Sequence, residues 1–557
     1  MTASTSTLTP DTHSVPGAVA DAETQSQPLD LANLTGYDKF TATTTAMARG
    51  SRPDYPRWLR HIHAAAGCTQ PVRLAGQLRT RTVNTGTGQI INETATSTAQ
   101  MPDGVIYKAC GNRRASVCPS CAEIYRADAY QLVAAGLKGG KGVPETVGGH
   151  PAVFATLTAP GFGIVHTTRT NKKNKPAPCR ARRQPDLCAH GVDLRCMRVH
   201  QDGDHRLGTP LCAECYDYDH HAVWNTQASE LWRRTQMTAA RLLDRYARDH
   251  GHVPRVRNSA TGRLRWGKTP VRISFGKCAE FQRRGLVHFH ILARFDGINP
   301  DDPDEVIAPP AWANSFLLAW ILRKAVEQTH FQTHGLVLVD HHGHQLVDQP
   351  DGWPMAWGSS QGIDIRPVRV RGSDPLTEER VADELDHGRR MLTGNAVAGY
   401  LAKYATKATE ITGHTSRKIT PSTVEFYANN THPGRLIASC WRLGQRGLQT
   451  TSEWEDSGYH RLRRWAHMLG FGGHFFTKSR RYSTTFRQLR KARVDYRRAH
   501  HERQEHLEEN EEIETIAELV YAGTGWHTTG DALLANTAAA LAREHRYVAR
   551  LEIATTA

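Results

Sequence analysis

Residues 279–293 read AEFQRRGLVHFHILA, and this stretch decides the expected fold. Alternate side chains of a β-strand point to opposite faces, so His288 and His290 should project together from one face. The opposite face is apolar and carries Val287, Phe289, Ile291 and Ala293. The stretch therefore predicts a strand that packs on one side and presents two neighbouring imidazoles on the other.

A turn comes directly before this strand. If residues 283–285 form a three-residue hairpin loop, Gln282 pairs with Leu286 and Glu280 lies opposite His288. Two imidazoles and a carboxylate with open positions suit Mg²⁺ or Mn²⁺ holding a phosphate. Two surface histidines would look the same in a chain that has 30 of them. The metal ligands His288, His290 and Glu280 are thus a hypothesis that needs a second motif.

That second motif is GYLAKYATK at residues 399–407, in an alanine-rich segment predicted to be helical. Tyr400 and Tyr404 are four residues apart and share a helix face, beside a cationic row of Lys403 and Lys407. A phenol with a pKa near 10 is a poor nucleophile at neutral pH. Nearby lysines and a metal-bound phosphate would lower the barrier to its attack. The alternative is that both tyrosines are half-buried packing residues.

Eight of the 11 cysteines fall into two groups, each ending in a CxxC pair. Structural zinc takes four thiolate or imidazole ligands, and a CxxC turn supplies two of them. The first predicted set is Cys68, Cys110, Cys118 and Cys121. The second is Cys188, Cys196, Cys212 and Cys215, with Cys179, His190, His200 and His205 as substitutes. Buried reduced thiols or a redox CxxC are the alternatives.

Composition limits the class of protein. The 557 residues include 70 Lys and Arg against 55 Asp and Glu, a net charge of +15, which favours a polyanionic partner over a merely solvated basic surface. The hydrophobic share of 39% excludes a wholly disordered chain. No apolar run approaches the roughly 18 residues of a membrane span, and the first residues lack the features of a signal peptide. We therefore expect a cytoplasmic protein.

Taken together, three stretches resemble the HUH endonucleases that initiate rolling-circle replication. They are FATLT at 154–158, HFH at 288–290 and YLAKY at 400–404, in the expected order. The chain is more similar still to the RepSA-type replication initiators of actinobacterial plasmids and integrative conjugative elements. Stretches such as GVIYKACGNRRASVCPSCAEIYRAD, VFATLTAPGFG and GFGGHFFTKSRRYSTT carry this likeness, which extends from about residue 58 to about residue 482.

The resemblance implies an α+β fold with an HUH-endonuclease core, a five-stranded antiparallel sheet with helices on one face. It implies that His288, His290 and Glu280 hold Mg²⁺ or Mn²⁺ on a scissile phosphate of single-stranded DNA. Tyr404 would attack that phosphate and leave a 5′-phosphotyrosyl bond and a free 3′-OH. Tyr400 would be the second nucleophile, and Lys403 would stabilise the transition state.

The expected organisation has four parts. Residues 1–50 form a disordered acidic tail, 51–150 a Cys-containing zinc region, 151–415 the catalytic domain with a zinc insertion at about 176–222, and 416–557 a basic, then acidic, mostly helical region. Two basic stretches are candidates for contact with DNA phosphates. Their residues are Lys172, Lys173, Arg182 and Arg183 in one, and Arg480, Arg481, Arg487 and Arg490 in the other. Tyr482, Phe486 and Tyr496 are candidates for stacking on bases.

These expectations describe a rolling-circle replication initiator, a metal-dependent single-strand endonuclease and strand transferase. Its partners would be single-stranded origin DNA and a host helicase and polymerase, without a membrane, at the nucleoid or a plasmid. Its cofactors would be catalytic Mg²⁺ or Mn²⁺ and structural Zn²⁺ at two sites. The alternatives are a non-catalytic, zinc-stabilised DNA-binding regulator, or a relaxase or transposase with the same chemistry.

Overall fold

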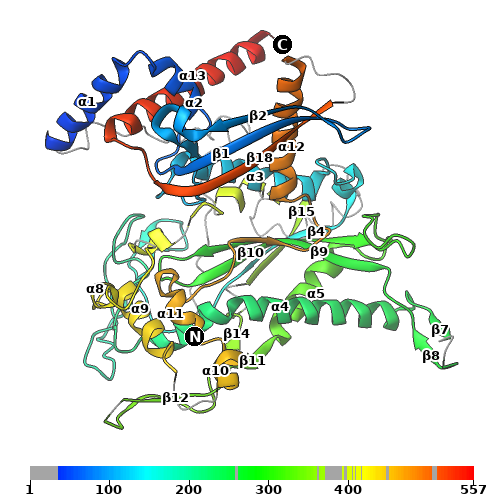
Figure 1. Cartoon of the computed structure of the whole chain (residues 1–557). Coiled ribbons are helices and arrows are strands. Elements are labelled where there is room, and N and C mark those ends of the chain that lie inside the picture. The colour runs from blue at the N-terminus through cyan, green and yellow to red at the C-terminus, as the bar shows by residue number, and fades with distance from the viewer. Residues whose placement is uncertain are drawn as a thin grey trace. The chain divides into compact units, whose positions relative to one another are not determined.

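The computed structural model divides the chain into two compact units (Figure 1). One unit, the central unit, contains Ala129–Thr484; the other, the terminal unit, combines the described residues from 36 to 128 with Thr485–Ala557. Segments on both sides of the central unit in the sequence thus form the terminal unit. The structure describes residues 36–257, 261–340, 342–359, 363–369, 392–393, 398–399, 401–403, 405–407, 409–414, 417–446, 451–504 and 511–556.

A six-stranded sheet forms the middle of the central unit. Its strand order is β16-β15-β4-β10-β9-β17; the strands from β15 to β17 pair antiparallel, and only β16 at the edge is parallel to its neighbour. The bounds are β4 Ala152–Leu157, β9 Val271–Phe281, β10 Val287–Gly297, β15 Ile363–Arg369, β16 Leu392–Thr393 and β17 Phe476–Lys478. The expected antiparallel sheet is therefore present.

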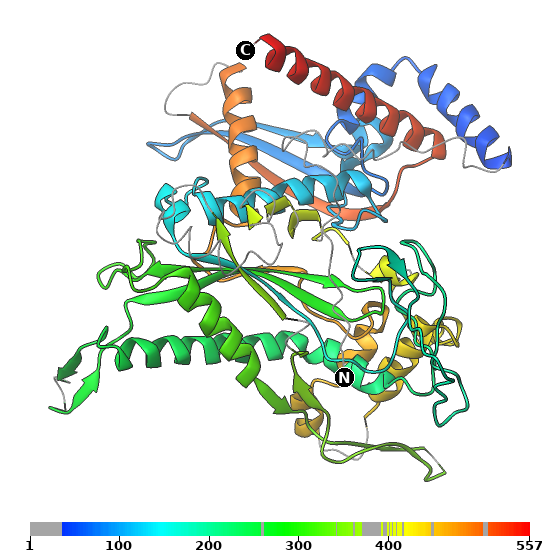
Figure 2. The ribbon, with the colours of Figure 1, turned by 180° about the vertical axis from the view of Figure 1, so that it is seen from behind.

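Two long helices lie on one side of this sheet, α4 (Tyr218–Asp249) and α5 (Ser315–Gln328) (Figures 1 and 2). α4 begins at Asp217, whose carboxylate accepts a hydrogen bond from the backbone N–H of His220 and so satisfies a donor of the first turn. Apolar side chains of both helices share one core with the odd-numbered residues of β10. The sheet therefore has one face closed by helices.

The hairpin between β9 and β10 has the register that its turn predicts. The backbone N–H of Gln282 donates to the carbonyl of Leu286 at 2.8 Å, and Gly285 has a φ of +80°, which favours glycine. Glu280 pairs directly with His288. The expected register is confirmed, and it sets the carboxylate and the imidazole on the same face.

A buried ion pair anchors the far end of β10. Arg294 and Asp296, both fully buried, are joined by hydrogen bonds of 2.7 and 3.0 Å. His150 Nδ1 lies 2.8 Å from the same carboxylate, and Arg294 also donates to the carbonyls of Gly136 and Tyr482. Burial would raise the pKa of Asp296, but His150 and Arg294 outweigh it and lower the pKa. This network connects β10 to the second half of α3 and to the segment after β17.

Shorter elements complete the central unit. Four two-stranded sheets of short strands are β5 Arg169–Thr170 with β6 Pro176–Ala177, β7 Arg255–Arg257 with β8 Leu264–Trp266, β11 His330–Gln332 with β14 Pro354–Ala356, and β12 Leu336–Val339 with β13 Gln345–Gln349. Further helices are α8 Val424–Tyr427, α9 His432–Leu443, α10 Thr451–Ser457 and α11 Arg461–Arg464. Side chains of α9 and α11 belong to the same core as α4 and β10.

The terminal unit is built on a four-stranded sheet in which β1 lies between β18 and β2 and also pairs with β3. The strands are β1 Val72–Asn84, β2 Ile90–Ser97, β3 Ile106–Lys108 and β18 Glu511–Thr524. The helices are α1 Gly36–Gly50, α2 Tyr55–Ile62, α12 Phe486–Gln504 and α13 Thr529–Thr556, together with the first half of α3 Pro119–Lys138. α1 packs against α13, so two segments far apart in the sequence lie side by side (Figure 1).

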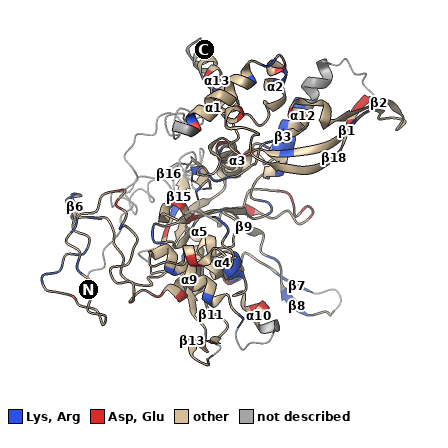
Figure 3. Ribbon diagram, turned by 60° about the vertical axis from the view of Figure 1, so that its left-hand side comes forward, with Lys and Arg blue, Asp and Glu red and all other residues tan. Residues whose placement is uncertain are grey.

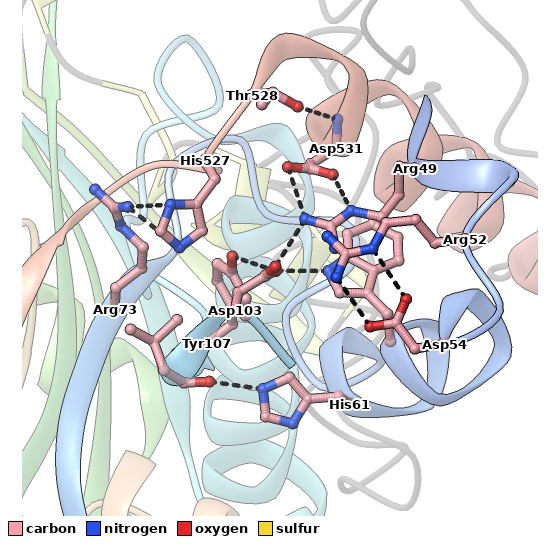
Figure 4. Close-up of polar contacts among 12 residues, drawn as sticks. Arg49, Arg52, Asp54, His61, Arg73, Asp103, Tyr107, His527, Thr528 and Asp531 are labelled. Atoms are coloured by element: carbon pink, nitrogen blue, oxygen red, sulfur yellow. Dashed lines mark hydrogen bonds and ion pairs between the residues drawn. The ribbon is translucent and has the colours of Figure 1, made fainter. Parts of the chain in front are cut away.

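Arg49 of α1 is the centre of a buried ion-pair network in this unit. Its guanidinium lies between Asp103 and Asp531, at 2.7 Å from each, and Trp58 Nε1 donates to Asp103 at 2.7 Å (Figure 4). All three charged side chains are buried. Burial would lower the pKa of Arg49, but the two carboxylates outweigh it and raise the pKa. Tyr107 adds a further hydrogen bond to Asp103.

One expectation about the ends of the chain was wrong. Residues 36–50, expected to belong to a disordered tail, form α1; residues 1–35 lie outside the described part. Residues 511–524 lie in the region expected to be mostly helical and form a strand, β18, because β1 offers a long partner with complementary charge. Arg81 pairs in register with Glu514, and Arg79 forms an ion pair with Glu518 at 3.7 Å. Among the described residues, no helix is both long and apolar enough to cross a membrane.

We predict that Arg49→Met lowers the free energy of unfolding by about 3–5 kcal/mol, because it leaves two buried carboxylates without their cation. Arg52→Met is the matched control, since Arg52 pairs with Asp54 at an exposed position and should contribute less than about 1 kcal/mol. Urea denaturation followed by tryptophan fluorescence measures both. Equal losses in the two variants would contradict the role of Arg49.

Lys277 of β9 gives a second prediction. It is buried on the apolar face, with Nζ 3.6 Å from the ring centroid of Phe289, and burial lowers its pKa to about 7. The unfolded chain binds the proton more tightly, so this lysine destabilises the fold increasingly as the pH falls from about 10 to about 7. Lys277→Met should raise the free energy of unfolding by at least about 1 kcal/mol at neutral pH, and by less near pH 10. Exposed Lys268→Met is the control; a gain independent of pH would refute the explanation.

Candidate functional site

Glu280, His288 and His290 form one compact cluster on the sheet face opposite α4 and α5. Oε2 of Glu280 lies 2.9 Å from Nε2 of His288 and 3.0 Å from Nε2 of His290. All three side chains are buried, and their ligand atoms lie within 4.8 Å of one another. Neighbouring ligands of an octahedral Mg²⁺ or Mn²⁺ are separated by about 3 Å. The donor set therefore fits a divalent cation.

The electrostatics of this cluster favour an ionised carboxylate beside a neutral His290. Burial would raise the pKa of Glu280, but the hydrogen bonds with His288 and His290 outweigh it and lower the pKa to about 2. Burial, together with the neighbouring charge of His288, lowers the pKa of His290 to about 4. Cations bind to neutral imidazole and ionised carboxylate, so Glu280 and His290 are in the form that metal binding needs.

Three further residues orient the imidazoles. Thr156 Oγ1 of β4 lies 3.1 Å from Nδ1 of His290, and Gln282 Nε2 donates to Nδ1 of His288 at 3.4 Å. The ring of Phe154 stacks on that of His290, with centroids 5.7 Å apart. We did not predict these roles from the sequence, although Phe154 and Thr156 belong to the FATLT motif. Strand alternation alone would have placed Thr156 on a sheet face, but not beside His290.

The predicted nucleophiles Tyr400 and Tyr404 lie outside the described residues. Their described neighbours contact β9 on the face that carries Glu280. The thiol of Cys278, two residues before Glu280, donates to the carbonyl of Leu401 at 3.6 Å. Burial lowers the pKa of Lys407, and the charge of Glu280 acts against that shift. Lys403, a further predicted residue, is exposed.

Cys68, Cys110, Cys118 and Cys121 come together in the terminal unit, as the spacing predicted. The sulfur atoms of Cys110 and Cys121 are 3.7 Å apart, and those of Cys68 and Cys118 are 3.8 Å apart. All four residues are free thiols. Ligands of tetrahedral zinc with Zn–S bonds of about 2.3 Å lie about 3.8 Å apart. The geometry fits a four-cysteine zinc site.

The second predicted set of cysteines was wrong in one ligand. Cys188, Cys212 and Cys215 lie together, but their fourth neighbour is His190, which the spacing indicated only as a substitute. Cys196 lies instead with His166, Cys179 and His200. The insertion therefore contains two clusters, and the described residues contain three Cys/His clusters where we expected two zinc sites. The remaining substitute, His205, belongs to neither cluster.

The predicted DNA-contacting residues differ in their exposure and in whether they form ion pairs within the protein. Lys172, Lys173, Arg182, Arg183, Arg487 and Arg490 are exposed, whereas Arg480 and Arg481 both form ion pairs with Asp304. Tyr482 was wrongly expected to stack on bases, since it is fully buried. Its ring fills the space left by two glycines, Gly136 and Gly276, where an added Cβ would collide with it.

A basic surface that we did not predict lies on β7 and β8. Arg255, Arg257, Arg263 and Arg265 are exposed on this hairpin, beside the exposed Trp266 (Figure 3). The Arg255 guanidinium lies 4.9 Å from the ring centroid of Trp266. The signal was present in the alternation of arginine with apolar residues in RVR and RLRW.

Comparison with known proteins gives the class of the chain. A curated replication initiator protein of Streptomyces ambofaciens is 38% identical over 512 residues, which cover 90% of this chain and 93% of that protein. No solved structure matches. The chain is therefore a replication initiator protein.

Within that class the family is also clear. The family model described as RepSA, "Replication initiator protein, pSAM2", matches residues 54–540. The chain belongs to the RepSA family. The match continues beyond residue 482, where we expected the likeness to end, so it includes β18 and the start of α13.

We predict that Glu280→Gln weakens Mn²⁺ binding at least about tenfold, equivalent to about 1.4 kcal/mol, because the cluster loses its anionic ligand. Electron paramagnetic resonance of free Mn²⁺ measures the affinity directly. Asp348→Asn, which removes an exposed carboxylate from β13, is the matched control and should leave the affinity unchanged. Equal affinities for wild type and Glu280→Gln would show that the cation binds elsewhere.

Proposed function

We propose that this replication initiator starts rolling-circle replication by nicking single-stranded origin DNA with a tyrosine, as an endonuclease of the HUH type. The observation that carries the proposal is the Glu280–His288–His290 cluster, fixed on two paired strands beside the segment that bears the YLAKY motif. A rigid carboxylate and two imidazoles supply a cation site, and the motif, whose Leu401 carbonyl accepts a hydrogen bond from Cys278 of β9, supplies the phenol.

In this proposal Tyr404 attacks the scissile phosphorus. Its oxygen loses its proton and forms a phosphotyrosyl bond to the 5′ end of the downstream strand, and the O3′–P bond breaks. O3′ leaves with the electron pair and takes up a proton, which gives a free 3′-OH. A divalent cation at the cluster would supply charge neutralisation at the phosphate oxygens. Lys403 would stabilise the added negative charge of the transition state.

Rejoining reverses the same chemistry. A 3′-OH attacks the phosphotyrosine, a phosphodiester forms, and the phenol is released, so no nucleotide cofactor is consumed. Tyr400 is proposed as the second nucleophile, which would cut a second time after one round of replication. The 3′-OH that the first cut leaves is a primer end, for which a host polymerase and helicase are the proposed partners.

The DNA path is proposed from exposed basic residues. The loop with Lys172 and Lys173, the pair Arg182 and Arg183, and the β7–β8 hairpin belong to the central unit, which also holds the cation cluster. Arginine and lysine contacts to phosphates bind DNA without reading its sequence. Trp266 can stack on an unpaired base. The Cys188 cluster would hold structural zinc that braces the segment with Lys172, Lys173, Arg182 and Arg183, and the Cys68 cluster would hold structural zinc in the terminal unit.

We predict that the wild-type chain, incubated with Mn²⁺ and labelled single-stranded origin DNA, forms a protease-sensitive covalent adduct. Tyr404→Phe should abolish the first cleavage, because phenylalanine has no oxygen to attack phosphorus. His290→Ala should lower adduct formation to the level found with EDTA. Tyr427→Phe, at a half-buried tyrosine of α8, is the matched control and should form the adduct normally.

Two outcomes would contradict this function, and a third would contradict only the choice of nucleophile. Specific binding of origin DNA without any adduct would identify a non-catalytic DNA-binding regulator. If the Tyr400→Phe/Tyr404→Phe double variant still forms the adduct, the protein nicks DNA with another nucleophile, and the choice of these tyrosines is refuted. Cleavage of a conjugative transfer or transposon-end sequence in preference to a replication origin would instead indicate a relaxase or transposase.

A further inference from the structure

The segment between β4 and α4 has almost no core of its own. Residues 163–215 are all described and contain only the two-residue strands β5 and β6 and isolated bridges. The buried apolar side chains within these residues are Leu207 and three cysteines, Cys179, Cys196 and Cys212. Segments that lack a core depend on disulfides or metal ions, and the cysteines are free thiols. The two Cys/His clusters are therefore the interior of this segment.

One cluster, called the mixed site here, consists of His166, Cys179, Cys196 and His200. Nδ1 of His166 lies 3.2 Å from Nε2 of His200, and Sγ of Cys196 lies 3.3 Å from the same nitrogen. Sγ of Cys179 lies 4.0 Å from His166 Nδ1. Tetrahedral zinc separates its nitrogen and sulfur ligands by about 3.3–3.8 Å. Four ligand atoms thus surround a space of the right size.

Contacts around the mixed site orient its ligands. Nδ1 of His200 lies 2.6 Å from the carboxylate of Asp204, so this nitrogen donates and Nε2 is left to face the other ligands. Carboxylates orient metal-binding histidines in this way. The backbone N–H of Thr167 donates to the sulfur of Cys179 at 3.3 Å, which fixes the position of this sulfur.

The other cluster, called the cysteine-rich site, consists of Cys188, His190, Cys212 and Cys215. Nδ1 of His190 lies 3.2 Å from the sulfur of Cys215 and 3.8 Å from that of Cys212. Cys215 is exposed and Cys188 is only half-buried. Hydrophobic burial therefore does not explain why these thiols gather around one point.

The two sites alternate along the chain. The mixed site takes its ligands from residues 166 and 179 and then from 196 and 200, whereas the cysteine-rich site takes them from 188 and 190 and then from 212 and 215. The mixed site closes the loop between Cys179 and Cys196, which contains Cys188 and His190. The cysteine-rich site closes the loop between His190 and Cys212, which contains Cys196 and His200. Mutual backbone hydrogen bonds between Arg180 and Cys196, of 2.8 and 3.0 Å, reinforce the first closure.

We propose that residues 166–215 bind two structural zinc ions in this interleaved arrangement, one at the mixed site and one at the cysteine-rich site. With the ion at the Cys68 cluster, the chain then holds three structural zinc ions. The proposal is independent of the nicking chemistry. Because each ion closes a loop that carries ligands of the other, loss of one ion should weaken the binding of the second.

The mixed site also supports the turn between β9 and β10. His166 exchanges backbone hydrogen bonds of 2.9 Å with Gly208 and Thr209. Gly208, with a φ of +85°, packs so closely on the backbone of Arg283 that a Cβ would lie 2.5 Å from it. An ion at the mixed site would therefore fix the segment that contacts the turn next to Gln282 and His288.

Zinc content tests the proposal. The full chain, purified with zinc under reducing conditions, is measured by plasma mass spectrometry. Cys179→Ser and Cys212→Ser should each lose at least one zinc ion relative to wild type, and the double variant should lose two. Cys440→Ala, in the buried core of α9, is the control and should lose none. Unchanged zinc content in Cys179→Ser, or loss of a single ion in the double variant, would overturn the proposal.

Thiol alkylation tests it without a substitution that could unfold the chain. With zinc bound, the exposed Cys215 and the half-buried Cys188 should resist maleimide, although their exposure alone predicts reaction. A chelator should make them reactive together with Cys179 and Cys196, while buried Cys278 and Cys440 stay protected. Rapid labelling of Cys215 in the zinc-loaded chain, or chelator-independent protection of Cys179, would overturn the respective site.

A substitution that keeps a metal-binding side chain at residue 200 distinguishes metal ligation by His200 from a role in packing. In the cobalt-substituted chain, His200→Cys should keep its metal content and gain thiolate-to-cobalt absorption, whereas His200→Ala should lose one ion. His200→Ala should also release the ion of the cysteine-rich site at a chelator concentration at least about tenfold lower than wild type does, about 1.4 kcal/mol of coupling. Full metal content in His200→Ala would overturn the mixed site, and an unchanged release point would overturn the coupling.

Discussion

Strand β10 is buried on both faces along all eleven residues, and much of the central unit follows from that constraint. The odd-numbered face is apolar and packs in the core that α4 and α5 share. The even-numbered face carries two histidines, an arginine and an aspartate, and buried polar groups of this kind are costly unless they are paired. Each has its partner: Glu280 forms hydrogen bonds with His288 and His290, and Arg294 forms an ion pair with Asp296.

The same pairing prepares the candidate site for its ligand. Without a cation, Glu280 and the two imidazoles satisfy one another, so the cluster costs little stability. The ligand atoms are already close to the separations that a divalent cation needs. Because the residues belong to paired strands and not to a loop, little ordering remains to be done when a cation and a phosphate arrive. One arrangement thus serves both stability and the proposed chemistry.

Where a local rule set the geometry, prediction from the sequence was accurate. A three-residue turn fixes hairpin register, and that rule alone was enough to place Glu280 opposite His288. Paired cysteine spacing likewise gave the four thiols around Cys68. The sequence did not reveal the contacts that depend on a distant partner: β18 forms beside the basic strand β1, and Cys196 joins Cys179 because a loop closes between them.

The sequence by itself therefore determined the family, the paired strands with their His and Glu residues, and the residue types available to bind metal. Only the tertiary structure decided which of these residues meet. It joined α1 to α13 through Arg49 and Asp531, divided the cysteines of the insertion between two clusters, and buried Tyr482. The physical reason is that turns and strand alternation act over a few residues, whereas buried charges and metal ligands find partners of matching chemistry at any separation along the chain.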